Sequence, residues 1–138
     1  MATITANGIT ISYEIEGSGP PLVLVAGLGY GRWMWHKMVP GLAEQFTVLS
    51  YDNRGVGETD KPAGPYNAQL LAEDLCCLLE ALGWKETAVF GHSMGGFIAQ
   101  AFALAYPDKL SKLILSATNF GGPRHVPVTQ EALAVLMD

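Results

Sequence analysis

The sequence predicts an α/β fold in which parallel strands alternate with helices that cover both faces of one sheet. Short, continuous apolar runs bounded by Gly and Pro, such as residues 21–26, are typical of strands buried on both faces. Segments whose apolar residues recur every three to four positions separate these runs and indicate helices. Because strands and helices alternate along the chain, the sheet is expected to be parallel after its first strands.

The expected elements follow in a regular order. Alternating residues around Asn7-Gly8 predict an antiparallel hairpin at the start of the chain. Asn67 is placed to cap a helix that Gly83 ends. The other expected elements are a strand at 21–26, a helical segment at 32–46 interrupted at Pro40-Gly41, a strand at 46–51, a strand at 87–90, a helix at 94–106 stopped by Pro107, a strand within 110–117 and a helix after Pro127.

Composition excludes several classes of function. The 138 residues are predicted to form one domain, and a net charge of -5 with no basic cluster argues against nucleic-acid binding. No run approaches the roughly 20 apolar residues of a membrane span, and the N-terminus lacks the pattern of a signal peptide. The adjacent Cys76 and Cys77 are interpreted as buried thiols rather than a redox pair. We therefore expect a cytoplasmic protein.

The charge content is low. Charged residues make up 15% of the chain, against about 25% in an ordinary globular domain. Such a composition indicates either a large interior or apolar surface that contacts something outside the chain.

The most informative segment is residues 91–95, Gly-His-Ser-Met-Gly, a G-x-S-x-G motif between an expected strand and an expected helix. A nucleophilic Ser93 must stand clear of the sheet, which requires a tight and strained turn. Gly91 and Gly95 flank it because side chains there would collide with neighbouring elements. The helix that follows directs free N–H groups at the reacting centre, so the Met94 N–H is a candidate oxyanion donor.

The glycine-rich segments also fit the outline of other motifs. An ordinary strand-to-helix turn without catalytic meaning stays open. A phosphate-binding loop is excluded because Phe97 stands where lysine is needed. A dinucleotide fingerprint at residues 27–31 fails because Arg32 occupies the place of its last glycine.

Four segments in order, at residues 17–29, 51–59, 91–96 and 106–115, carry a family resemblance. They resemble the α/β-hydrolases of the small esterase, lactonase and cofactor-free haloperoxidase type, in the N-terminal half only. The resemblance implies that residues 1–122 form the N-terminal part of the hydrolase core and that residues 123–138 begin the cap region. It implies no cofactor and no metal.

The same resemblance assigns further residues. The turn after the first central strand supplies the second oxyanion donor in this family, which makes the backbone N–H of Leu28 the candidate. Ala26 stands where many members have histidine. Asp52 and Arg54 match the D-x-R-G-x-G segment, and we interpret Asp52 as part of an ion pair that pins the loop rather than as the catalytic acid.

A nucleophilic serine needs a base that is oriented by an acid, and the family order is Ser, acid, His. Asn119 stands where some relatives place the acid, and it carries no charge. We therefore expect half of a protein, completed by a missing C-terminal half or a second chain, and inactive alone. The strand around 113–115 would then be a bare apolar edge. The acids and base available after Ser93 are Asp108, Glu131, Asp138 and His125, none of them well placed.

The leading hypothesis is a serine hydrolase that acts on carboxylic esters or lactones through an acyl-enzyme on Ser93. A non-catalytic α/β-hydrolase-like binding or interaction module is the alternative. A third hypothesis keeps the fold and changes the reaction to a lyase, a C–C bond hydrolase or a perhydrolase. A cluster near the oxyanion turn indicates either an apolar pocket or core packing: Tyr30, Trp33, Met34 and Trp35.

Overall fold

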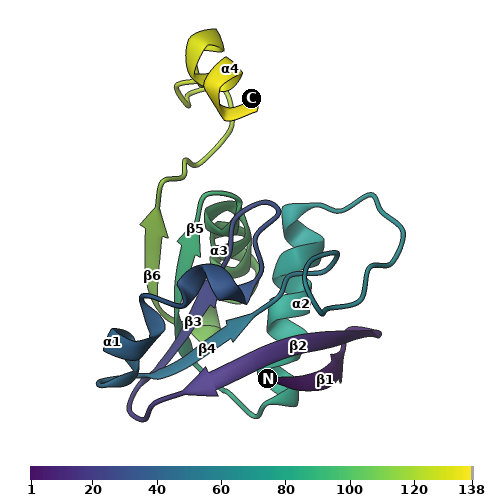
Figure 1. Cartoon of the computed structure of the whole chain (residues 1–138), viewed down its shortest axis with the longest axis vertical. Helices are drawn as coiled ribbons and strands as arrows, with labels where there is room; N and C mark the ends of the chain where they lie inside the picture. The colour runs from purple at the N-terminus through teal and green to yellow at the C-terminus, as the bar shows by residue number, and fades with distance from the viewer. Residues whose placement is uncertain (138) are drawn as a thin grey trace.

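The computed structural model describes residues 1–137 and forms one mixed sheet (Figure 1). In these residues the sheet has six strands in the order β1-β2-β4-β3-β5-β6. The pairs β1-β2 and β2-β4 are antiparallel and the other three pairs are parallel, which confirms the predicted hairpin start and parallel continuation. The strands are β1 (Ala2–Ala6), β2 (Ile9–Glu16), β3 (Pro21–Val25), β4 (Thr47–Tyr51), β5 (Thr87–His92) and β6 (Leu110–Ser116).

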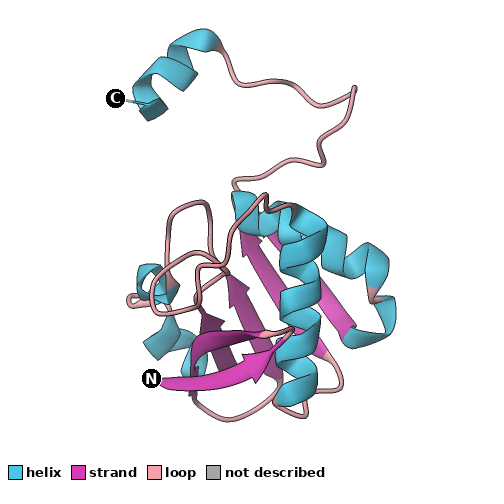
Figure 2. Cartoon of the chain, turned by 90° about the vertical axis from the view of Figure 1, so that its right-hand side faces the viewer, coloured by secondary structure: helices cyan, strands magenta, loops and turns pink. Residues whose placement is uncertain are grey.

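Helices cover both faces of the sheet, as expected (Figures 1 and 2). Along β3, Val23 and Val25 face the helices α2 (Ala68–Ala81) and α3 (Met94–Ala105) in the larger buried cluster. The alternate residues Leu22 and Leu24 face the other way, toward the 3-10 helix η1 (Arg32–Trp35) and α1 (Val39–Ala43). Because side chains on both faces of β3 are buried, its sequence is a continuous apolar run.

Local signals in the sequence fix several element ends. Asn7 and Gly8 both have positive φ, at 50° and 74°, as a two-residue hairpin turn requires. The Asn67 side chain accepts a hydrogen bond from the Leu70 N–H at 2.8 Å and caps α2, while Gly83 has a φ of 73° just after that helix. The predicted cap and stop of this helix are confirmed.

The prediction for residues 32–46 was partly wrong. Instead of one interrupted helix, the chain forms η1 and then the separate five-residue α1. Pro40 lies in the first turn of α1, where its missing N–H would have had no partner within the helix. Pro40-Gly41 therefore lies in the first turn of a helix, and the break falls before that helix.

The strand β6 lies at one edge of the sheet. Leu113, Ile114 and Leu115 are 37%, 39% and 43% exposed, which confirms the expected apolar edge. Beyond β6 the chain leaves the core, and α4 (Gln130–Met137) stands apart from the sheet (Figures 1 and 2). The division into a core at 1–122 and the start of a cap at 123–138 stays a prediction.

Both cysteines are free thiols on α2, as interpreted; the expected burial is confirmed for Cys76, whereas Cys77 is only half-buried. Burial, together with the nearby Glu80 carboxylate, raises the pKa of Cys76 to about 11. Burial also raises the pKa of Cys77. Within residues 1–137, no helix combines the length and the apolar character that crossing a membrane would require.

We predict that Cys76 reacts slowly with iodoacetamide at pH 7.5, because the thiolate is the nucleophile and the pKa of this thiol is about 11. The rate should rise about tenfold per pH unit up to that value. Peptide mass spectrometry of timed samples measures it, with urea-unfolded chain as the control for an ordinary thiol. Equal rates in folded and unfolded chain at pH 7.5 would contradict the prediction.

Candidate active site

Ser93 occupies the sharp turn between β5 and α3. Its backbone has φ 55° and ψ -120°, a region that residues with a Cβ rarely adopt. Neighbouring backbone holds it there: the Ser93 N–H donates to the Ser116 carbonyl at 2.9 Å, and the Ser93 carbonyl accepts from the Thr118 hydroxyl at 2.8 Å. The side chain is left exposed at the carboxyl end of the sheet.

The flanking glycines allow this turn to close. A Cβ on Gly91 would overlap the Gly95 carbonyl oxygen, and a Cβ on Gly95 would overlap the Val25 carbonyl oxygen. A Cβ on Gly96 would meet the Thr118 side chain. The predicted reason for the glycines is therefore confirmed, because α3 meets β3 and β5 backbone to backbone.

The turn after β3 lies directly beside Ser93. A Cβ built on Gly27 would be 3.3 Å from the Ser93 Cβ. The turn is closed by the Tyr30 N–H, which donates to the Gly27 carbonyl at 3.3 Å, and Gly29 supplies the positive φ of 74°. Among the described residues, the backbone N–H groups of Leu28 and Met94 donate no hydrogen bond within the chain. Two free donors thus flank the exposed serine.

Asp52 is buried, and both of its carboxylate oxygens accept hydrogen bonds. Its carboxylate accepts from the Arg32 N–H and the Arg32 Nη1, both at 2.6 Å, and from the Glu58 N–H at 3.0 Å. A Cβ on Gly57 would overlap this carboxylate, which explains that glycine. Asp52 is part of an ion pair that pins the loop, as interpreted, with Arg32 as its partner.

Arg54 pairs instead with the buried Asp74 of α2. Its Nε and Nη2 donate to the two carboxylate oxygens at 2.8 and 2.7 Å, and the Asn7 Nδ2 donates to the same carboxylate at 2.8 Å. The hydrogen bond to Asp74 raises the pKa of Arg54. One carboxylate thus ties the first hairpin and the 52–60 loop to α2.

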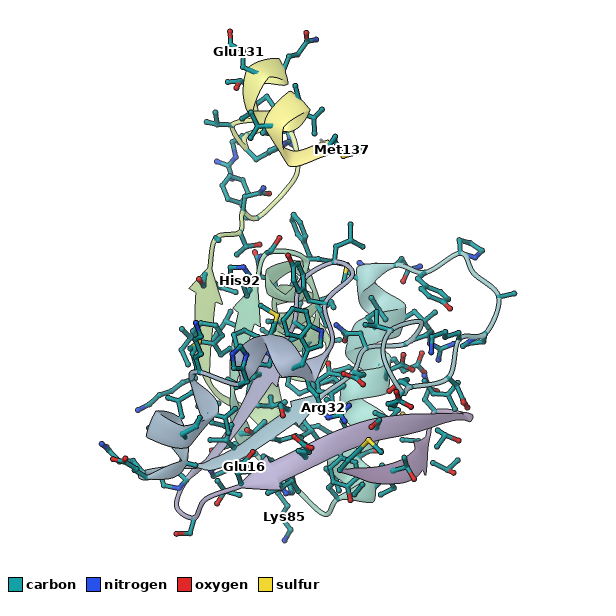
Figure 3. All side chains as sticks on the ribbon, in the orientation of Figure 1. Glu16, Arg32, Lys85, His92, Glu131 and Met137 are labelled. Carbon is teal, nitrogen blue, oxygen red and sulfur yellow. The ribbon has the colours of Figure 1, made fainter. Side chains whose placement is uncertain are left out.

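Each of the three histidines contacts a group other than Ser93. His92 lies at the end of β5 with its Nδ1 3.3 Å from the Ser116 Oγ (Figure 3). The Nδ1 atoms of His36 and His125 lie 2.9 and 2.6 Å from the carbonyl oxygens of Trp33 and Gly122. None is hydrogen-bonded to Ser93 in the part of the chain that the structure describes.

The acids that follow Ser93 are also remote from it. Asp108 lies in the 3-10 helix η2 (Pro107–Lys109), which follows the far end of α3. Glu131 is on α4, away from the core (Figure 3), and Asp138 lies outside the described residues. In residues 1–137 no cluster of three or more His, Cys, Asp or Glu side chains could hold a metal ion.

A cavity of about 500 Å³ opens beside the turn. Both Leu28 and Met94, the residues with the free N–H groups, line it. The rest of its wall comes from the turn after β3, the 54–67 loop, the start of α2 and the start of α3: Gly29, Arg54, Gly55, Val56, Tyr66, Asn67, Ala68, Leu71, Phe97 and Ile98.

The family model described as "alpha/beta hydrolase fold" matches residues 20–135. The chain belongs to the α/β-hydrolase family. It is 38% identical over 109 residues to a soluble epoxide hydrolase of Corynebacterium sp. (strain C12), covering 79% of this chain and 38% of that protein. It is 36% identical over 103 residues to the putative carbamate hydrolase RutD of Azorhizobium caulinodans, covering 75% and 39%.

Among solved structures, the enol-lactonase of Burkholderia xenovorans LB400 is similar, with a TM-score of 0.79 and 33% identity. The match covers 81% of this chain and 45% of that one. The chain thus spans less than half the length of these relatives. Two of these three proteins are hydrolases by name, and the third is named as an enol-lactonase.

The α/β-hydrolase sequence predicted only part of this site. It placed Ser93, Leu28 and Met94 at one location, and the structure brings them together. The nearby apolar cluster does not form the cavity: Trp35 and Met34 pack in the core, while Tyr30 and Trp33 are exposed. The cavity residues from the 54–67 loop and Phe97 were missed, since no local pattern marks them.

Replacing Ser93 by Gly should raise the free energy of unfolding by about 1 kcal/mol, because glycine adopts this backbone conformation without strain. Ser93→Ala is the matched control, since alanine keeps the Cβ and therefore the strain. Urea denaturation of the three chains measures both effects. Equal stability of the Gly and Ala variants would show that the turn is not strained.

Replacing Asp74 by Ala should destabilise the folded chain by about 3 kcal/mol or more, because it leaves the Arg54 guanidinium without its buried partner. Glu73→Ala, at the exposed neighbouring position of α2, should change stability by less than about 0.5 kcal/mol. Denaturation midpoints and slopes give the comparison. Similar losses in both variants would contradict a specific role for the buried pair.

Proposed function

We propose that this chain carries the nucleophile of a serine hydrolase that acts on carboxylic esters or lactones through an acyl-enzyme on Ser93. One observation carries the proposal: an exposed serine in a strained strand-to-helix turn, flanked by two backbone N–H groups without partners in the described chain. This arrangement is the geometry that acyl transfer requires.

In the proposed reaction, the Ser93 Oγ attacks the carbonyl carbon while a base takes its proton. The carbonyl oxygen becomes an oxyanion, held by the N–H groups of Leu28 and Met94 and favoured by the N-terminal end of α3. Collapse of the intermediate expels the alcohol, which receives the proton, and leaves the acyl group on Ser93. Water then attacks the acyl-enzyme and releases the acid.

The chemistry of serine favours carbonyl substrates over the epoxide named for one relative. Attack of Ser93 on an epoxide carbon would form an ether, which water does not readily cleave, so turnover would stop. Attack on an ester or lactone forms an ester on Ser93, which water can hydrolyse. The enol-lactonase and the carbamate hydrolase among the relatives are named for substrates with such a carbonyl group.

The base and acid of the triad are proposed to come from polypeptide outside residues 1–138, as a C-terminal continuation or a second chain. Two observations support this. None of the histidines is hydrogen-bonded to Ser93 within residues 1–137. The edge strand β6 offers an exposed apolar row on which further strands can pair. The 138-residue chain alone is then inactive.

A second candidate function is a non-catalytic binding module in which the serine turn borders a ligand cavity. Two observations favour it: the three histidines contact groups other than Ser93, and an open cavity of about 500 Å³ lies beside the turn. The two functions differ in one property, because only an activated serine reacts with a fluorophosphonate.

The test begins with native mass spectrometry of the protein from its source cells, followed by the denatured mass. We expect species that contain polypeptide beyond these 138 residues, including a histidine. In those species a fluorophosphonate should label Ser93, while the 138-residue chain alone should react at background rate. Efficient labelling of the isolated chain would contradict the proposed origin of the base.

Ser93→Ala in the complete species should lower kcat for p-nitrophenyl butanoate by about 10⁶ or to background, because the nucleophile is lost. Ser18→Ala, an exposed serine in the loop between β2 and β3, is the matched control and should leave kcat unchanged. Retained esterase activity in Ser93→Ala would contradict the acyl-enzyme mechanism. Absent labelling in the complete species would favour the binding module.

A further inference from the structure

We propose that the cavity beside Ser93 is the acyl-chain site and that it takes an aliphatic chain rather than a polar or charged acyl group. The inference rests on the proposed function and names the substrate class for the same site. Three properties of the cavity support it: the hydrogen bonds that its polar side chains already make, the burial of its floor, and its position beside the two oxyanion donors.

Each polar side chain in the wall makes at least one hydrogen bond within the protein. Arg54 donates through Nε and Nη2 to Asp74, the Asn67 side-chain Oδ1 accepts from the Leu70 N–H, and the Tyr66 hydroxyl donates to the Pro62 carbonyl. A polar acyl group would lose its water and gain few hydrogen bonds in return, which is unfavourable.

The remaining side chains of the wall are apolar. Leu71 and Ile98 form a buried floor, with exposed fractions of 5% and 0%. Leu28 and Phe97 are exposed at 76% and 38% and border the opening, where their own apolar surface contacts water until a ligand covers it. An aliphatic chain that enters between them buries apolar surface on both partners.

The cavity lies on the acyl side of the serine. Leu28 and Met94 supply both the N–H groups that would hold the oxyanion and part of the cavity wall, so a substituent of the carbonyl carbon starts at its mouth. The base that activates the serine must also protonate the leaving group. No histidine is among the residues that line the cavity, whereas the Ser93 backbone is hydrogen-bonded to Ser116 and Thr118, at the end of and just after the edge strand β6. The leaving group therefore points toward β6, and the acyl chain enters the cavity.

A neighbouring cleft of about 370 Å³ has the opposite character. It shares only Gly29 and Val56 with the cavity, and its wall includes Glu14, Arg32 and Asp52, which are joined in ion pairs. An aliphatic chain gains little there, so the two sites are distinguishable by the residues that respond to a ligand.

The test is binding of sodium alkanoates from acetate to octanoate to the full 138-residue chain, followed by amide chemical shifts in NMR. An alkanoate is the acid product, so its carboxylate should shift the Leu28 and Met94 amides while its chain shifts Leu71 and Ile98. Affinity should rise about fourfold for each added methylene. 1-Octanol should bind at least tenfold more weakly than octanoate because it brings no charge to the two N–H groups.

Ala68→Phe places a ring in the cavity wall and should abolish the dependence on chain length, and Val56→Phe should do the same from the facing loop. Ala81→Phe, at the exposed far end of α2, should keep it. Equal affinity for acetate and octanoate, shifts confined to the Arg32 cleft, octanol binding as tight as octanoate, or unchanged chain-length dependence in both cavity variants would overturn the assignment.

Binding of an alkanoate requires no activated serine. Loss of the proposed hydrolase activity with retained chain-length dependence would therefore overturn the acyl-enzyme and leave the aliphatic-chain cavity standing. Labelling of Ser93 without chain-length dependence would overturn the cavity assignment alone.

Discussion

The first turn of α3 approaches the sheet so closely that backbone lies against backbone at Gly91 and Gly95, and the rest of the site depends on this close contact. With no Cβ on Gly91 or Gly95, the helix can start immediately after β5 and lie against the Val25 carbonyl of β3. The chain has then only one residue in which to reverse direction. That residue is Ser93, which takes the positive φ and projects from the end of the sheet.

The same contact determines where the two free N–H groups lie. Because α3 begins at Met94, the N–H of its first residue has no acceptor in the preceding turn. Because Val25 and Gly91 are opposite each other in the parallel register, the turns after β3 and β5 leave the sheet at one level. Gly27 can then approach Ser93 closely, and Leu28 follows it.

Two buried carboxylates hold the loops around this turn. Buried charges are costly unless they are fully bonded, and here each carboxylate has several donors. Asp52 fixes the Arg32 segment to the loop after β4, while Asp74 fixes Arg54 and the first hairpin to α2. The loop that carries Val56 and Tyr66 is therefore anchored at its base, which gives the cavity a defined wall.

The sequence by itself determined the order and type of most elements, because these depend on local physics. Asn7-Gly8 specifies a hairpin turn, Asn67 a helix cap, and Gly91, Ser93 and Gly95 a tight strand-to-helix turn, each through conformations available within a few residues. Only the tertiary structure decided that Asp52 pairs with Arg32 and that Pro40 lies in the first turn of a helix. It also decided which side chains line the cavity. Those residues come from four segments far apart in the chain, and their contacts are set by how the helices pack on the sheet rather than by any periodicity that the sequence displays.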